Sequence, residues 1–265
     1  MNILEEIIEY KREEVKSQKS KVKMADLEKR ELFSRPVLPL KDFLLDRSKT
    51  GIIAEFKRRS PSKGIINPDV DIVEVTKGYA KNGASCLSVL TDAHFFGGSD
   101  EDLIKARINN IPILRKDFII DEYQLVASRS VGADVILLIA ACLAPAEVKR
   151  LAAFAKNLGL EVLLELHAEE ELDHICDDTN IIGINNRNLK TFEVDIERSL
   201  RMAEKIPLSK LKIAESGISS VDNILLFKQH GFHGFLIGEN FMKAANPTIA
   251  FAEFVKQLKA KAHED

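Results

Sequence analysis

Short apolar runs recur along this 265-residue chain from residue 51 onward and decide what it can fold into. Their average spacing is about 26 residues, the length of one strand plus one helix. Each run is rich in Ile, Val and Leu and is continuous rather than alternating, which is typical of parallel strands buried on both faces. The predicted strands are 52–57, 86–90, 113–116, 135–139, 161–166, 181–185, 212–215 and 234–237.

This repeat predicts an α/β fold of the (β/α)8 TIM-barrel class, which typically takes about 250 residues. An open doubly wound sheet is the structural alternative. That fold, however, favours a Gly-x-Gly-x-x-Gly turn after the first strand, and residues 58–64 read RRSPSKG instead. We therefore predict a closed barrel over residues 49–265.

The segment before the repeat has a different character, because the first 30 residues carry 15 charges. Apolar Ile3, Leu4, Ile7 and Ile8 recur at helical spacing and predict an amphipathic helix over 3–19. A second short helix is expected over 25–31, followed by a loop with Pro36 and Pro39. We interpret residues 1–48 as a helical extension docked on the barrel, within one domain spanning 1–265.

Several helix boundaries follow from local signals. The helix over 69–81 ends at Asn82-Gly83, Pro145 suits the first turn of a helix that runs to residue 157, and Ser219 or Ser220 caps a helix that runs to His230. The acidic run 169–171 is expected to start another helix, where the helix dipole favours carboxylates.

The overall charge excludes some classes of function. A net charge of −3 gives no basic face for nucleic acid, and the longest apolar run, 12 residues over 135–146, is too short to span a membrane. The N-terminus lacks the pattern of a signal peptide. Cys86, Cys142 and Cys176 form no CxxC pair, so reduced thiols in a cytoplasmic protein are expected.

The histidines do not predict a metal site. His167 and His174 are seven residues apart, and His230 and His233 flank two residues, neither of which is a zinc pattern. We expect these side chains to be surface or capping histidines, and we expect no bound metal.

Polar residues end five of the apolar runs, and scattered surface charge has no reason to fall at that position each time. Active residues of this barrel class lie at the carboxyl ends of the strands. Glu55 and Lys57 are two residues apart and therefore share one face of their strand. The full set of strand-end residues is Glu55, Lys57, Lys116, Glu165, Asn185, Arg187, Glu215 and Ser216.

Two glycine-containing segments follow the last two strands, Glu215-Ser216-Gly217-Ile218 and Gly238-Glu239-Asn240. Barrels often bind phosphate at this position through backbone N–H groups, and glycine lets the backbone approach a ligand closely. These segments are thus candidates for a phosphate site, although tight strand-to-helix turns would look the same.

The strand ends also carry motifs that resemble those of the indole-3-glycerol phosphate synthase family. They run in order over nearly the whole chain after residue 50. The N-terminal KREEV at 11–15 resembles the extra segment of the family, and no second, fused barrel is expected after residue 250. The motifs are AEFKRRSPSKG at 54–64, SVLTDAHFFGGS at 88–99, LRKDFIIDEYQ at 114–124, LLELH at 163–167, GINNRNL at 183–189, AESGI at 214–218 and LIGENFM at 236–242.

The resemblance implies a lyase without metal or cofactor that acts as a monomer on a phosphorylated small molecule. The family converts 1-(2-carboxyphenylamino)-1-deoxyribulose 5-phosphate to indole-3-glycerol phosphate, carbon dioxide and water. By position, Lys116 matches its general acid, Glu165 its general base and Lys57 a substrate-binding cation that assists proton transfer. Residues matching those that hold the substrate, its phosphate or the lysines are Glu55, Asn185, Arg187, Glu215, Ser60, Ser216, Gly217, Gly238 and Glu239.

The chemistry of this reaction requires the same inventory. A protonated lysine suits an acid that meets charge on the ketone oxygen, and an ionised glutamate suits a base. The sequence does not divide the acid roles between Lys57 and Lys116. The benzene ring needs an apolar slot, for which the candidates near strand ends are Pro61, Phe95, Phe118 and Leu137, although they could equally be ordinary packing.

The same residues argue against three other functions. Phosphoribosylanthranilate isomerase chemistry favours a Cys at the first strand end, where this chain has Glu55 and Lys57. A Schiff-base aldolase needs a lysine where the sixth strand ends in Asn185. A non-catalytic binding or regulatory barrel is disfavoured by the intact set of acid, base and cation, but a fold alone does not prove catalysis.

Overall fold

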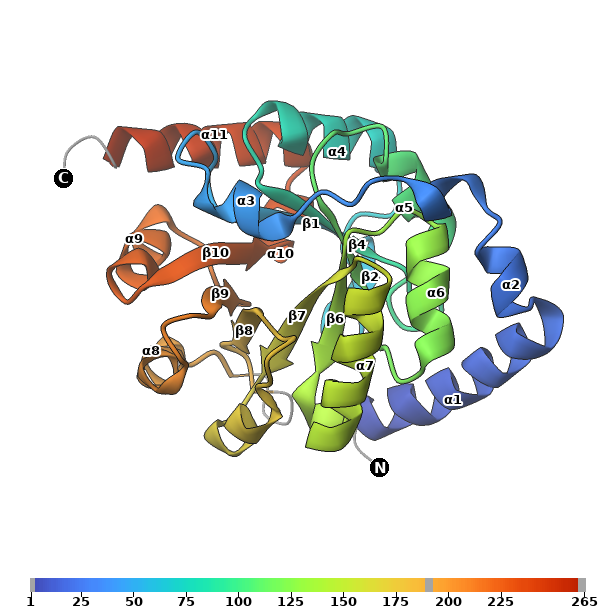
Figure 1. The fold of residues 1–265 in the computed structure, drawn as a ribbon. Coiled ribbons are helices and arrows are strands. Elements are labelled where there is room, and N and C mark those ends of the chain that lie inside the picture. Colours follow the sequence, from blue (N-terminus) through green and yellow to red (C-terminus); the bar gives the residue numbers. More distant parts are fainter. Residues whose placement is uncertain (1–2, 189–192, 262–265) are drawn as a thin grey trace.

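The computed structural model describes residues 3–188 and 193–261 (Figure 1). Within these residues, eight parallel strands close into a barrel in the order β1-β10-β9-β8-β7-β6-β5-β4. Closure confirms the predicted barrel over the open sheet. The barrel strands are β1 (Ile52–Phe56), β4 (Cys86–Leu90), β5 (Ile113–Lys116), β6 (Val135–Ile139), β7 (Glu161–Leu166), β8 (Ile181–Asn185), β9 (Leu211–Glu215) and β10 (Phe232–Ile237).

Helices surround this barrel (Figure 1). The caps agree with the sequence where they were predicted: Ser220 accepts from the backbone N–H of Asn223 at the start of α9, and Pro145 opens α7. The helices are α4 (Ile72–Lys81), α5 (Asp100–Ala106), α6 (Glu122–Ser130), α7 (Pro145–Asn157), α8 (Ile196–Lys205), α9 (Val221–Gln229), α10 (Glu239–Met242) and α11 (Pro247–Lys261).

The connection after β7 differs from the prediction. The acidic run starts a 3₁₀ helix, η3 (Glu169–His174), rather than an α-helix. The last residue of η3 fixes the position of this helix. The ring nitrogens of His174 lie 3.0 Å from the carbonyl oxygen of Glu171 and 2.8 Å from that of Leu143. A short hairpin, β2 (Arg59–Ser60) with β3 (Gly64–Ile65), follows β1.

Strand alternation divides the apolar residues into two cores. The outward-facing residues pack under the helices, as Ile52 and Ala54 do. The inward-facing residues fill the barrel, as Ile53, Leu137 and Ile213 do. Because alternation continues to the ends of the strands, the next inward positions above this packed interior are the polar residues that end the apolar runs.

The N-terminal segment supplies helices at both rims: α1 (Ile3–Lys21), α2 (Met24–Leu27), η1 (Glu31–Ser34) and α3 (Leu40–Leu45). The predicted helix over 25–31 is therefore wrong in extent. The segment with Pro36 and Pro39 was expected to be a loop, yet Pro39 is the N-cap of α3, which inserts Leu40 and Leu44 into the inner core. Buried Asp134 fixes this segment by accepting from the Leu38 backbone N–H at 2.8 Å and from the guanidinium of Arg35.

Helix α1 is anchored across the carboxyl ends of β4 and β5 by a buried lysine. The Nζ atom of Lys11 lies 2.9 Å from Asp92 Oδ2, 3.0 Å from Asp117 Oδ1 and 2.6 Å from Glu14 Oε2. The side chain is only 2% exposed. Burial lowers the pKa of Lys11, but the charges of Asp117 and Asp92 outweigh burial and raise the pKa above its ordinary value. The ammonium is therefore charged at neutral pH.

No described helix is long and apolar enough to cross a membrane. The three cysteines are free thiols; Cys86 is buried, while Cys142 and Cys176 are half-buried.

Replacing Lys11 with Met should lower the free energy of unfolding by about 3–5 kcal/mol, because the change leaves Asp92 buried without its cation and leaves Asp117 with Arg115 alone. Urea unfolding measures the effect. Lys16→Met on the same helix is the matched control: the Lys16 side chain is 79% exposed, and its removal should change stability by less than about 0.5 kcal/mol. Equal effects of the two substitutions would contradict this account of α1.

Candidate active site

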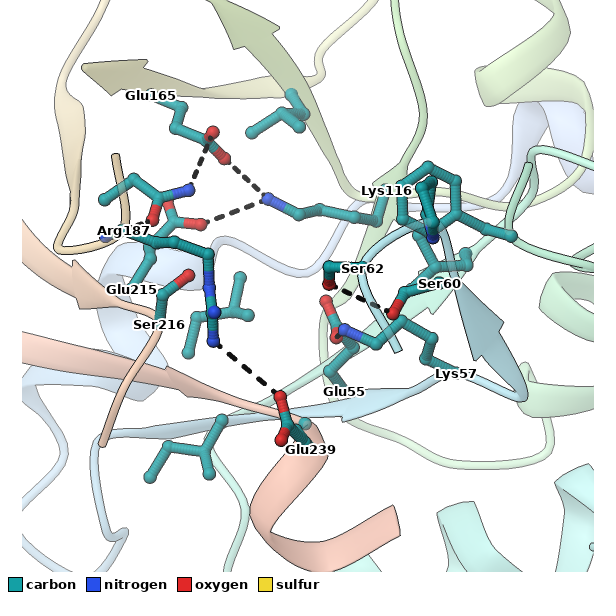
Figure 2. Close-up of a pocket in the computed structure, with 18 of the residues that line it drawn as sticks. Glu55, Lys57, Ser60, Ser62, Lys116, Glu165, Arg187, Glu215, Ser216 and Glu239 are labelled. Atoms are coloured by element: carbon teal, nitrogen blue, oxygen red, sulfur yellow. Dashed lines mark hydrogen bonds and ion pairs between the residues drawn. The ribbon is translucent and has the colours of Figure 1, made fainter. Parts of the chain in front are cut away.

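A cavity of about 320 Å³ opens at the carboxyl ends of the barrel strands. This volume lies at the lower end of the range for small-molecule sites, about 300–1,000 Å³. Figure 2 shows the charged side chains converging on it. The predicted site residues that line it are Glu55, Lys57, Ser60, Pro61, Lys116, Phe118, Leu137, Glu165, Asn185, Arg187, Glu215, Ser216, Gly217, Gly238 and Glu239.

Strand register brings these residues to one level. Asn185 of β8 pairs with Glu215 of β9, and Glu165 of β7 pairs with Ile139 of β6. The polar ends of β8 and β9 therefore become neighbours on the inner wall. Closure of the sheet then sets Lys116 of β5 across from Glu165 and Glu215.

Lys116 extends between two carboxyl groups (Figure 2). Its Nζ atom lies 2.7 Å from Glu165 Oε2 and 3.1 Å from Glu215 Oε2. Glu165 has a further donor, because Asn185 Nδ2 donates to its Oε1 at 3.2 Å. Both glutamates are buried. The single ammonium group of Lys116 thus contacts two carboxyl groups that have little access to water.

The three groups differ in protonation. Burial raises the pKa of Glu215 to about 8, with Lys116 opposing and Glu165 reinforcing the shift. Burial acts in the same direction on Glu165, but Lys116 and His167 outweigh it and hold the pKa of that carboxyl well below its usual range. Burial lowers the pKa of Lys116, yet the surrounding glutamates raise it above normal overall. At pH 7, Glu165 and Lys116 are therefore ionised and Glu215 keeps its proton.

A second ion pair lies on the wall formed by β1. Lys57 Nζ is 2.6 Å from Glu55 Oε1, and Lys57 remains 17% exposed toward the cavity. The two residues point to the same side, as the alternation of a strand predicts.

Two glycines make room for the buried carboxylates. A Cβ atom on Gly183 would overlap Glu215 Oε1, and one on Gly238 would overlap Glu55 Oε1. Any larger residue at either position would push the neighbouring glutamate away from its lysine.

The loops after β9 and β10 form the wall opposite β6. Ser216 has φ +67° and Gly217 has φ +70°, and a non-glycine residue in this left-handed region is uncommon and concentrated at functional sites. Glu239 faces two cations: its Oε2 lies 3.7 Å from Arg187 and its Oε1 lies 3.4 Å from Lys63 Nζ. Figure 2 shows the contact between Arg187 and Glu239 across the cavity mouth.

The structure does not place Phe95 on the cavity wall. Phe95 packs against Tyr10 and His94, with ring centroids 5.7 Å and 4.6 Å away, and the neighbouring Phe96 lines the cavity instead. The backbone N–H groups of Phe95 and Phe96 both donate to Asp92 Oδ1 in the turn after β4. Consecutive side chains leave such a turn on different sides, and the sequence FF gives no signal for which one turns inward.

The expectation for His167 was also wrong. Its side chain is only 8% exposed and its Nε2 atom lies 2.9 Å from Glu165 Oε1. His167 follows Glu165 by two residues, so strand alternation could have placed both on the inner face.

Sequence reasoning also missed the contribution of α1 to the site. Ile3, Leu4 and Ile7 line the cavity. Their apolar stripe predicted a packing partner, but helical periodicity does not identify which surface that partner is. Leu189, which ends the motif at 183–189, lies outside the described residues.

No group of three or more His, Cys, Asp or Glu side chains is placed to hold a metal ion within residues 3–188 and 193–261. The polar groups at the cavity are instead paired with one another.

Comparison with known proteins identifies the family. The family model described as indole-3-glycerol phosphate synthase matches residues 4–254. The chain belongs to the indole-3-glycerol phosphate synthase family. A synthase of this name from Bacteroides thetaiotaomicron is 47% identical over 97% of this chain and 99% of its own length. Those from Bordetella pertussis and Acinetobacter baumannii are 42% and 41% identical, each over 96% of this chain and over 99% and 96% of their own lengths.

Solved structures with low sequence identity share the barrel fold. Tryptophan synthase subunit alpha from Legionella pneumophila superposes with a TM-score of 0.61 at 14% identity, covering 85% of this chain and 97% of that one. Thiamine phosphate pyrophosphorylase from Pyrococcus furiosus gives 0.57 at 15% identity, covering 79% and 95%. These likenesses support the architecture of the synthase family member described here and carry no argument about its chemistry.

Glu215→Gln should change how stability depends on pH. The Glu215 carboxyl has a pKa of about 8 in the fold against an ordinary 4.5, so the folded state binds this proton more tightly. Its contribution to stability is full below the ordinary pKa and is lost as pH rises through about 8. The difference in unfolding free energy between wild type and variant, from urea titrations, should therefore fall as pH rises. A difference independent of pH would refute the assigned proton.

Proposed function

We propose that this cavity carries out the reaction of the indole-3-glycerol phosphate synthase family, with Lys116 as general acid, Glu165 as general base and Lys57 as the second cation. The activity is that of a carboxy-lyase acting on a phosphorylated small molecule. The observation that carries the residue roles is the placement of Lys116 Nζ within 3.1 Å of two buried carboxyl groups at the cavity wall.

Ring closure is the first step. The aromatic carbon that bears the carboxylate of 1-(2-carboxyphenylamino)-1-deoxyribulose 5-phosphate attacks the C2′ ketone. Negative charge develops on the ketone oxygen, and Lys116 meets that charge and donates a proton, so that a hydroxyl forms. Carbon dioxide then leaves and its bonding electrons restore the aromatic ring.

Dehydration completes the indole. A lysine donates a proton to the C2′ hydroxyl, which leaves as water, while Glu165 accepts the proton lost from the substrate. Lys57 lies 2.6 Å from Glu55 on the β1 wall, and Lys116 lies on the β5 wall, so the substrate hydroxyl has an ammonium on either side. Charged Lys116 suits an acid and ionised Glu165 suits a base, in line with the pKa directions of the two groups.

The remaining residues bind the substrate. Apolar Pro61, Phe118 and Leu137, together with Phe96 and the α1 residues, take the benzene ring. Ser60, Ser216, Gly217 and Gly238 hold the phosphate with backbone N–H or hydroxyl groups, and Arg187 adds a positive charge. In the free protein the Glu239 carboxylate pairs with Lys63 and Arg187. The substrate phosphate displaces this carboxylate from the two cations.

We also propose that the chain forms one domain and acts as a monomer in the cytoplasm, without metal or cofactor. The supporting features are the family membership and the three free thiols.

Turnover of the carboxyphenylamino-deoxyribulose phosphate, followed as a rise in indole fluorescence, tests the function directly. Lys116→Met should remain folded and lower kcat by about 10²-fold or more, and Glu165→Gln should do the same with little change in KM. Lys212→Met is the matched control, because Lys212 is also a buried strand lysine but lies at the opposite rim near the carbonyl of His230. Near-normal turnover by Lys116→Met would remove that residue as the acid.

Inorganic phosphate should inhibit competitively against the substrate if the loops after β9 and β10 hold the phosphate. Glu239→Gln should then tighten phosphate binding severalfold, an effect of about 1 kcal/mol or less for partly exposed charges. Inhibition constants measured at several substrate concentrations give both results. Glu253→Gln on the exposed surface of α11 serves as the control. Absence of competition at high phosphate would contradict the assignment of these loops.

A further inference from the structure

His167 is buried against Glu165 but belongs to no step described so far. It follows β7 directly and shares the inner face with Glu165, since the two are two residues apart. The described residues that line the cavity do not include His167. Any effect of the ring on the reaction must therefore pass through Glu165.

The imidazole completes the set of donors around the Glu165 carboxylate. Lys116 Nζ lies 2.7 Å from Oε2, Asn185 Nδ2 lies 3.2 Å from Oε1, and His167 Nε2 lies 2.9 Å from the same Oε1. Oε1 thus accepts from Asn185 of β8 and has the His167 ring at the end of β7 within reach, while Oε2 is directed to Lys116 at the cavity wall.

The histidine is in turn placed by the segment that follows it. Glu171 Oε2 accepts from the backbone N–H of His167 at 2.6 Å and of Ala168 at 3.4 Å. The same oxygen lies 3.9 Å from His167 Nδ1. The ring therefore lies between two carboxylates, one belonging to η3 and one to the site.

The His167 ring is buried without regular hydrogen bonds, which is unfavourable for stability unless the ring has a function. Neither ring nitrogen of His167 makes a hydrogen bond of regular geometry, although Nε2 lies 2.9 Å from Oε1. A buried polar group left in this condition lowers the stability of the fold. The Nε2 atom nevertheless lies within hydrogen-bond distance of Oε1, and the proposed role rests on this proximity.

We propose that His167 is a positioning residue: it donates from Nε2 to Oε1 of Glu165 and so holds this carboxylate ionised and directed toward the substrate proton that it removes. The inference rests on the role proposed above for Glu165. The charged and titratable groups around the pair come from every neighbouring element. They are Lys116 from β5, Cys142 from η2 (Ala140–Cys142), Glu171 from η3 and Glu215 from β9.

The direction of the pKa of Glu165 agrees with this role. Burial would raise that pKa, and Lys116 opposes burial most strongly, but His167 also lowers the pKa. Removal of the ring leaves Lys116 and Asn185 as the partners of the carboxylate, which should then take up a proton at a higher pH.

The test compares kcat against pH for the wild type, His167→Phe and His167→Gln. Phe keeps a ring without nitrogens, whereas the side-chain amide of Gln reaches a position similar to that of Nε2. For His167→Phe, kcat should fall about tenfold on the acid side and the acid limb should move up by about one pH unit, with KM nearly unchanged. His167→Gln should restore most of both. A merely structural role would not move the acid limb.

His174→Asn is the matched control, because His174 lies on η3 and contacts only the backbone carbonyls of Glu171 and Leu143 in the described structure. Its acid limb should coincide with that of the wild type. If His167→Phe does not fold, His167→Ala is assayed with and without added imidazole, which should restore the acid limb.

The outcomes separate this inference from the function on which it rests. Acid limbs that coincide in wild type and His167→Phe, no advantage of Gln over Phe, or an Ala variant indifferent to imidazole overturns the role of His167 alone. A wild type that makes no indole product overturns the proposed function as well.

Discussion

Closure of the parallel sheet is the constraint on which the rest of the structure depends. Every inward position of a closed barrel points at a shared axis, so side chains from strands far apart in the sequence meet. Packed apolar residues such as Ile53 and Leu137 fill the lower interior. The polar residues one step further along the strands have nowhere to go except the mouth, where Lys116, Glu165 and Glu215 meet at hydrogen-bonding distance.

Burial at the mouth of the barrel, together with Lys116, separates the pKa values of the two glutamates. In water three such groups would titrate near their ordinary values, but here burial raises the pKa of Glu215 to about 8 while Lys116 keeps Glu165 ionised. An acid and a base therefore coexist within one contact network at neutral pH. Two glycines make room for the buried carboxyl groups. The absence of a side chain leaves space for Glu215 at Gly183 and for Glu55 at Gly238.

The N-terminal segment completes the barrel at both ends. Its first helix is held by Lys11 between Asp92 and Asp117, and Asp117 directly follows Lys116. Thus the ion pairs that dock α1 lie beside Lys116, and α1 contributes Ile3, Leu4 and Ile7 to the cavity lining. At the other rim, Leu40 and Leu44 of α3 close the interior. The extension therefore shapes the site as well as stabilising the fold.

The sequence by itself determined the barrel strands, because continuous apolar runs at a regular spacing allow few other folds, and it determined which polar residues end them. The motifs at those ends also carried the family resemblance. Only the tertiary structure decided the docking of α1, the inward turn of Phe96 rather than Phe95, and the contact between His167 and Glu165. Each of these depends on the direction in which a loop or helix leaves the barrel. The partner of α1 is distant in the sequence, since Lys11 pairs with Asp92, whereas Asp92 and Glu171 fix the turns at Phe96 and His167 through hydrogen bonds to nearby backbone N–H groups. Periodicity within one segment reveals neither kind of contact.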